Sequence, residues 1–152
     1  MYDQLTKEAE IQEVEIIEIP FSPGCKGFYA DKIIAVNSLI ESTPEKLCIL
    51  TEELGHYHTS YGDITDQSDV RNRKQEIRAR RWAVQRLIQL DDLMQAFENG
   101  VRNRHELAEF LGVTEKFIDM SLEHFKNIYG HSRSHGDYTI YFDPLWISRR
   151  FE

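Results

Sequence analysis

Alternating polar and apolar residues mark the first part of the chain as strand-forming. From Glu13, the sequence Glu-Val-Glu-Ile-Ile-Glu-Ile alternates apart from one Ile-Ile step, which is typical of a strand with one buried face. Residues 20–27 are rich in turn-forming proline and glycine, and short β-rich runs follow at 28–30 and 33–37. The pattern predicts a small antiparallel sheet of about three strands, preceded by a weak helical pattern at residues 1–12.

Helical periodicity replaces this alternation from residue 43 onward. Thr43 is a good N-cap and Pro44 a good first helical residue. The residues that recur at helical spacing toward a core are Leu47, Leu50 and Leu54. We expect this helix to end near residues 60–62. Further helices are predicted at residues 70–90, 90–98, 104–111 and 114–129, and a short strand at 138–142.

Together these elements predict an α+β fold, in which a small antiparallel sheet packs on a helical core and a helical subdomain follows. The helices at 104–111 and 114–129 are joined by a tight turn at Gly112, as in a helix-turn-helix. We place the division at residues 1–90 and 91–152, with both parts expected to form one compact unit.

The charge of the chain is unevenly distributed. The net charge is −8, yet residues 67–90 carry seven basic and two acidic side chains, whereas residues 1–66 carry four basic and thirteen acidic ones. The acidic total argues against general affinity for nucleic acid. A solvated helix face accounts for the basic band, although a local binding patch is an alternative.

The remaining composition indicates a cytoplasmic protein. No run of about 18 apolar residues is present, so a membrane-spanning helix is not expected. The first residues lack the basic and then apolar pattern of a secretory signal. Cys25 and Cys48 do not form a disulfide framework, and we interpret both as free thiols in a reducing compartment.

The stretch Thr-Glu-Glu-Leu-Gly-His carries the candidate chemistry. Glu52 and His56 are four residues apart, so both lie on one face of a helix and can reach one cation. Glu53 would then point toward a water activated by the metal and could take its proton. A third ligand must come from elsewhere, and Glu76 on the next helix is the candidate. The alternative is a solvated surface of that helix, because neighbouring glutamates and a single histidine are common there.

These residues resemble the ImmA/IrrE family of small zinc-dependent endopeptidases encoded by phages and mobile elements. The resemblance includes the hairpin at 27–37, the Glu-Glu-Leu-Gly-His stretch, the helix at 72–83 and the segment around Gly112. It implies a zincin-like helical core. By position, His56 matches the second zinc ligand, Glu76 the third and Glu53 the general base, while Glu52 occupies the place of the first ligand.

Glu52 departs from the family pattern, where histidine is usual. A carboxylate can bind zinc, but two anionic ligands lower the positive charge that is available to acidify water. Such a site works more slowly or prefers a harder ion, so manganese is an alternative to zinc.

The resemblance implies a metal-dependent endopeptidase that cleaves a helix-turn-helix repressor and so relieves repression of phage or mobile-element genes. A peptidase-like module that binds the repressor without cutting it is a second hypothesis, motivated by Glu52. A DNA-binding regulator built on residues 104–129 is a third. The acidic side chains of its second helix, Glu115, Asp119 and Glu123, speak against it, because a recognition helix needs hydrogen-bond donors.

Three further histidines, His58, His131 and His135, are less favourable as metal ligands. His58 is two residues after His56 and therefore points to another side of the helix, so a partly exposed polar role is expected. His131 and His135 lie in a polar segment that we predict to be a loop.

Overall fold

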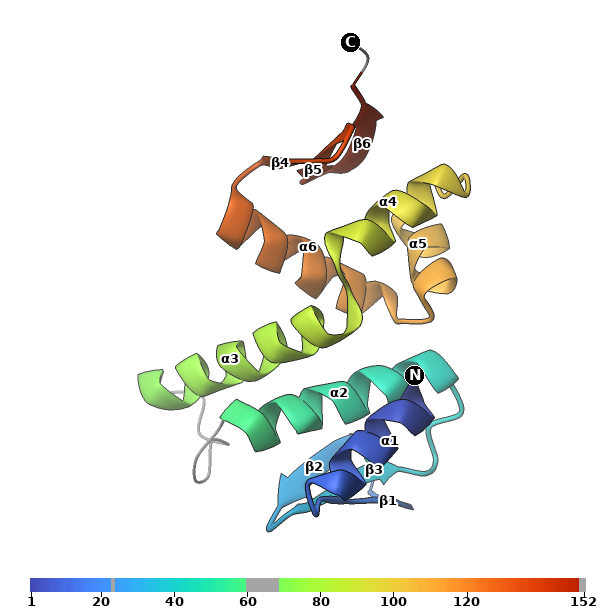
Figure 1. The fold of residues 1–152 in the computed structure, drawn as a ribbon. Coiled ribbons are helices and arrows are strands. Elements are labelled where there is room, and N and C mark those ends of the chain that lie inside the picture. Colours follow the sequence, from blue (N-terminus) through green and yellow to red (C-terminus); the bar gives the residue numbers. More distant parts are fainter. Residues whose placement is uncertain (23, 60–68, 151–152) are drawn as a thin grey trace. The chain divides into compact units, whose positions relative to one another are not determined.

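The computed structural model describes residues 1–22, 24–59 and 69–150. The predicted helix end at 60–62 falls outside these residues. The chain divides into two compact units, Met1–Arg86 and Leu87–Glu152, and each is described by itself. The α+β class is confirmed, because helices and two three-stranded sheets are present in the described residues (Figure 1). None of the described helices combines the length and apolar character that a membrane crossing needs.

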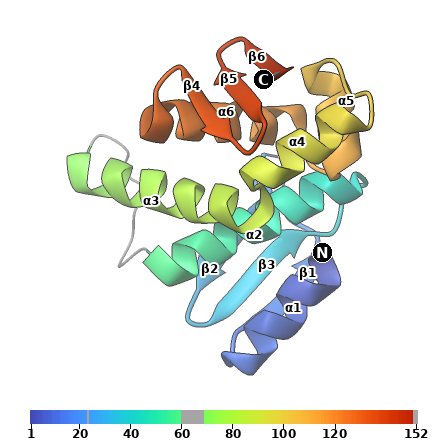
Figure 2. The ribbon, with the colours of Figure 1, turned by 45° about the horizontal axis from the view of Figure 1, so that its top comes forward.

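The first unit is built on a three-stranded sheet covered by helices. Its elements are α1 (Tyr2–Ile11), β1 (Glu15–Ile19), β2 (Gly27–Ala30), β3 (Ile33–Asn37), α2 (Thr43–Thr59) and α3 (Val70–Leu87). The strand order is β1-β3-β2. In the central strand β3, residues Ile34, Ala35 and Val36 are completely buried. Helix α2 packs against β2 and β3, while α1 packs against β1 (Figure 2).

The sheet is mixed rather than wholly antiparallel. Strands β2 and β3 pair antiparallel, as predicted, whereas β1 and β3 run parallel. The parallel arrangement requires a long connection between β1 and β2, and the buried side chain of Asn37 holds this connection in place. Its Oδ1 accepts hydrogen bonds from the backbone of Phe21 and Leu39 at 3.2 and 3.0 Å, and its Nδ2 donates to the Cys25 carbonyl at 2.9 Å. This amide therefore fixes the path by which the chain leaves β1 and returns as β2.

Helix α2 begins where the periodicity predicts, but its cap is one residue earlier. The Ser42 hydroxyl accepts a hydrogen bond from the Glu45 backbone N–H at 3.2 Å, so Ser42, and not Thr43, satisfies a free donor of the first turn. The predicted core leucines Leu47, Leu50 and Leu54 are buried. The predicted spacing of the core face is thus confirmed.

The second unit contains three helices and a meander of three strands. Its elements are α4 (Leu90–Glu98), α5 (Arg104–Leu111), α6 (Glu115–Tyr129), β4 (Ser132–His135), β5 (Tyr138–Phe142) and β6 (Leu145–Arg149). Gly112 adopts a left-handed conformation, φ 69°, between α5 and α6. The prediction of a loop around His131 and His135 is wrong for His135, which ends β4 and pairs with Tyr138. Strand β4 has no apolar residue, so its sequence alone carries no strand pattern.

Candidate functional site

Helices α2 and α3 approach each other closely at Gly55. A Cβ atom at this position would lie 2.3 Å from the carbonyl oxygen of Ala79 and 3.0 Å from its carbonyl carbon. Both separations are shorter than van der Waals contact, so only a glycine allows the two backbones to lie this close. Gly55 therefore determines how near the side chains of α3 come to those of α2.

Next to this close approach, His56 of α2 meets Glu76 of α3. The Nε2 atom of His56 lies 3.2 Å from Oε2 of Glu76, and both side chains are largely buried, with 16% and 21% exposed. The other oxygen of Glu76 lies 3.3 Å from Nε of Arg80, one turn further along α3. The carboxylate is thus held between an imidazole and a guanidinium group.

The surroundings of His56 favour its neutral form. Burial lowers the pKa of the imidazole below its ordinary value of 6.5, the carboxylate of Glu76 raises it in part, and Arg80 lowers it again. The net direction is downward. A neutral imidazole keeps the nitrogen lone pair that a metal ion or a proton donor requires.

Glu53, on the neighbouring side of α2, has a carboxyl group with a strongly raised pKa. Burial raises its pKa from 4.5 to about 7, and the charges of Glu52 and Glu76 contribute in the same direction. A Cβ atom added to Gly27 would lie 3.5 Å from Cγ of Glu53, so the side chain of Glu53 lies against the backbone of β2. A carboxyl group with this pKa is present in both protonation states at neutral pH and can take up and return a proton.

The pair of His56 and Glu76 fits the donor set of a zinc ion. Two donor atoms that each lie about 2.0–2.1 Å from a tetrahedral ion are separated by about 3.3 Å, close to the separation seen here. Within residues 1–22, 24–59 and 69–150, however, no group of three or more histidine, cysteine, aspartate or glutamate side chains is arranged to hold a metal. The structure therefore brings two predicted ligands together. The role of Glu52 in the place of the first ligand stays a prediction.

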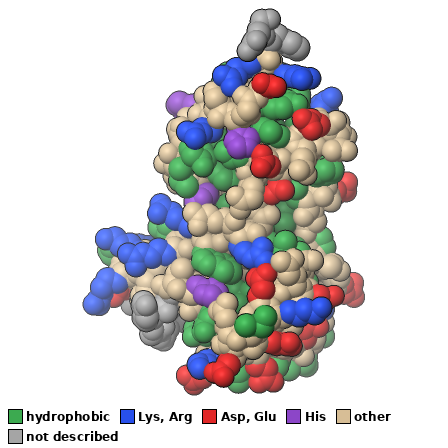
Figure 3. Space-filling view, in the orientation of Figure 1, with side chains coloured by type: hydrophobic (Ala, Val, Ile, Leu, Met, Phe, Trp, Pro, Cys, Tyr) green, Lys and Arg blue, Asp and Glu red, His purple; other side chains and the backbone are tan. Residues whose placement is uncertain are grey.

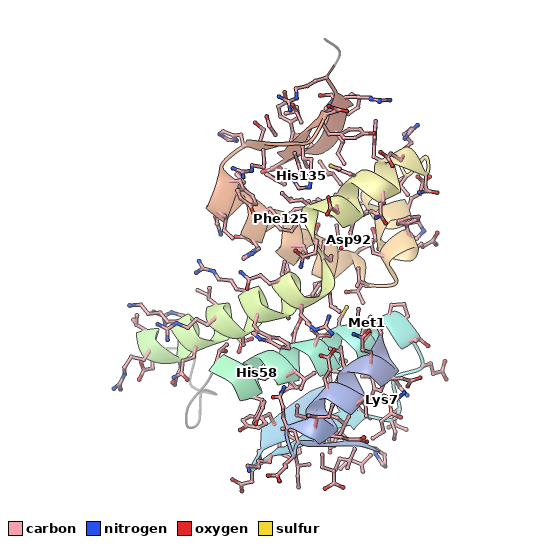
Figure 4. All side chains as sticks on the ribbon, in the orientation of Figure 1. Met1, Lys7, His58, Asp92, Phe125 and His135 are labelled. Atoms are coloured by element: carbon pink, nitrogen blue, oxygen red, sulfur yellow. The ribbon has the colours of Figure 1, made fainter. Side chains whose placement is uncertain are left out.

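His58 is placed in aromatic surroundings at the end of α2 (Figure 4). Its ring stacks on Trp82 with the centroids 4.7 Å apart, and it meets Tyr57 edge-on at 4.9 Å. Burial lowers the pKa of this imidazole. His58 thus packs α2 against Trp82 of α3. Its side chain is still partly exposed to solvent, as the sequence indicates.

The other two histidines belong to the second unit. Nε2 of His135 lies 2.6 Å from Oδ1 of Asp91, which joins the end of β4 to the first turn of α4. His131 precedes β4, and its backbone carbonyl accepts a hydrogen bond from Phe142. Both positions have structural roles in the meander and its attachment to α4.

Two residues that organise the site were not predicted from the sequence. Gly55 lies inside a helix, where glycine costs about 1 kcal/mol relative to alanine, so its presence there is a signal of close packing. Arg80 follows Glu76 by four residues, a spacing that pairs opposite charges on a helix. Both signals are present in the sequence, but neither identifies the partner across the helix crossing.

Comparisons with known proteins point to one family. The chain matches the peptidase family Peptidase_M78, described as the IrrE N-terminal-like domain, over residues 9–123. This range contains Glu52, Glu53, His56 and Glu76. Searches of curated proteins and of solved structures find no match.

Proposed function

The chain belongs to the IrrE N-terminal-like family of peptidases, and from this premise we propose that it is a metal-dependent endopeptidase. The observation that carries the proposal is the contact of 3.2 Å between His56 and Glu76, made beside a carboxyl group whose pKa is raised to about 7. A neutral histidine, an anionic ligand and a proton acceptor of suitable pKa are the groups that metallopeptidase chemistry needs.

In this proposal, His56 and Glu76 would hold the cation as the second and third ligands, and Glu52 would occupy the place of the first. A divalent ion such as zinc, with manganese as the alternative, would polarise the scissile carbonyl and lower the pKa of a water molecule. Arg80 orients Glu76, because it binds one carboxylate oxygen and leaves the other directed at His56.

Glu53 moves the protons of the reaction. Its carboxylate takes a proton from the attacking water as the tetrahedral centre forms, and the resulting acid delivers that proton to the leaving nitrogen as the peptide bond breaks. Burial and the charges of Glu52 and Glu76 raise the pKa of this carboxyl group, which makes it a stronger proton acceptor than an exposed glutamate.

We propose that the substrate is a helix-turn-helix transcriptional repressor in the cytoplasm, whose cleavage relieves repression. The family resemblance supports this substrate class. The test uses a helix-turn-helix repressor encoded beside the gene, incubated with the purified full chain with and without a chelator. Cleavage should stop with the chelator and with Glu53→Gln. Cleavage that survives both treatments would overturn the mechanism.

A second candidate function is a peptidase-like module that binds a repressor without cutting it. One observation favours it: Glu52 stands where histidine is usual in the family. Glu52→His separates the two functions. A sharp rise in cleavage and in bound zinc identifies Glu52 as a weakened ligand, whereas an inactive protein with no bound metal before and after the change favours the binding module.

A further inference from the structure

The outer face of α3 carries a row of basic side chains. Arg71, Lys74, Arg78 and Arg81, here called the basic stripe, follow one another at spacings of three, four and three residues, which place them on one side of a helix. All four are exposed. Figure 3 shows lysine and arginine side chains gathered over the end of α3 that begins at Val70. The stripe is about 15 Å long at 1.5 Å per residue.

Within the described part of the chain, most charges of this stripe have no carboxylate partner. Arg71 binds Asp69, with Nη2 and Oδ2 3.1 Å apart. Lys74, Arg78 and Arg81 make no ion pair with any carboxylate of the described residues. By contrast, Arg80 and Arg86 of the same helix bind Glu76 and Glu8. Three adjacent cations are therefore available to an external anion.

The stripe lies away from the candidate site. At 100° per residue, its members point to the side of α3 opposite Glu76, Ala79 and Ala83, and the two alanines are buried. Ile77 borders the stripe and is 47% exposed. A partner on this face would thus meet several cations and one apolar side chain without touching Glu53, His56 or Glu76.

We propose that the basic stripe binds an acidic helical segment of a partner protein, and that this protein is the substrate. The second part rests on the proposed function. A helix with carboxylates three and four residues apart matches the spacing of the stripe, because both follow the same helical repeat. Charge complementarity of this kind speeds association and selects partners.

A protein segment fits this surface better than nucleic acid does. The unit around the stripe is acidic, since residues 1–86 carry fifteen acidic and eleven basic side chains. A long polyanion would extend beyond the stripe over these carboxylates, whereas a short acidic segment ends where the stripe ends. The exposed Ile77 also offers an apolar contact that suits a protein partner.

The experiment measures binding without cleavage, using the full chain carrying Glu53→Gln. The probes are a fluorescein-labelled 18-residue helical peptide with glutamates at alternating three- and four-residue spacing, its glutamine counterpart, and a duplex DNA of about the same length. Fluorescence anisotropy at low salt should show the acidic peptide binding at least about tenfold more tightly than the glutamine peptide. Added salt should weaken this binding.

A matched pair of variants assigns the binding to the stripe. K74Q/R78Q/R81Q should weaken binding of the acidic peptide at least about tenfold. K7Q/K32Q/K116Q removes the same charge at exposed positions outside α3 and should leave the affinity within about twofold. Equal weakening by both variants, equal affinity for the two peptides, or tighter binding of the DNA would each overturn the proposal.

The substrate part has a separate readout. With wild-type Glu53 and the repressor as substrate, K74Q/R78Q/R81Q should raise KM and leave kcat unchanged, because the stripe touches no reacting group. Failure of the proposed function appears as an absence of cleavage while the acidic peptide still binds. Failure of the stripe appears as loss of peptide selectivity while cleavage and its KM stay the same.

Discussion

On the inner face of α3 a single carboxylate, Glu76, lies largely buried between an imidazole and a guanidinium group. On the outer face of the same helix four exposed cations stand in a row, and among the residues that the structure describes only Asp69 contributes a carboxylate that binds one of them. The inner charges have lost water and depend on the position of each partner, whereas the outer charges keep their hydration and need no partner. Changes on the inner face should therefore affect activity and folding, and changes on the outer face should affect association alone.

The largest expected effect is the loss of activity on removal of the inner carboxylate charge. Glu76→Gln should lower kcat/KM for repressor cleavage by about 100-fold or more, because the change weakens a cation ligand and releases Arg80 from its partner. Arg78→Gln, three residues before Arg81 on the outer face, is the matched control and should keep kcat. Steady-state kinetics compare the two. Equal kcat values for wild type and Glu76→Gln would contradict the distinction between the faces.

A substitution at the helix crossing should destabilise the fold. In an open helix, glycine to alanine stabilises by about 1 kcal/mol. Gly55→Ala should instead lower the free energy of unfolding by up to about 3 kcal/mol, because its Cβ would overlap the backbone of Ala79. Denaturant unfolding monitored by circular dichroism measures the change. An unchanged or increased midpoint would show that α2 and α3 are not in this close contact.

The buried carboxyl group makes the stability depend on pH. Burial raises the pKa of Glu53 from 4.5 to about 7, so the folded state binds this proton more tightly than the unfolded state. The corresponding stability is present below pH 4.5 and is lost as the pH rises to about 7, a change of about 3 kcal/mol. Unfolding at a series of pH values, with chelator throughout, should show this loss in wild type. The curve for Glu53→Gln should be flatter by that amount, and identical curves would refute the assignment.

The smallest effect is expected on the outer face. Lys74→Gln, Arg78→Gln and Arg81→Gln should each change the free energy of unfolding by less than about 0.5 kcal/mol, as for other exposed positions. Thermal unfolding of the single variants measures this. A loss of more than about 1 kcal/mol in any of them would show that the stripe takes part in folding.

The helices could be predicted because their signals are local. The spacing of Leu47, Leu50 and Leu54 and the positions of capping residues are readable within one helix, and these leucines are buried as expected. The parallel pairing of β1 with β3 could not be predicted, because it depends on hydrogen bonds that Asn37 makes to residues distant in the sequence. Strand β4 lacks an apolar pattern and forms through its pairing with β5.

The candidate site was predictable to a similar extent. The spacing of Glu52, Glu53 and His56 on one helix is a property of the sequence, and the place of Glu76 on the next helix, together with the family resemblance, made it the candidate third ligand. The distance between His56 and Glu76 could not be predicted from the sequence, because it depends on how closely two helices cross. The raised pKa of Glu53 likewise follows from burial that no single helix creates.

Gly55 also constrains how this protein can change by mutation. The atoms that a larger residue would meet belong to the backbone of Ala79, which every amino acid shares. No replacement of the side chain at position 79 can make room, so the two positions cannot exchange volume in the way that paired core residues do. Second-site suppressors of Gly55→Ala should therefore arise where α3 can shift as a whole, and not at Ala79. During evolution, a larger residue in place of Gly55 could therefore not be accommodated by a change of side chain at position 79.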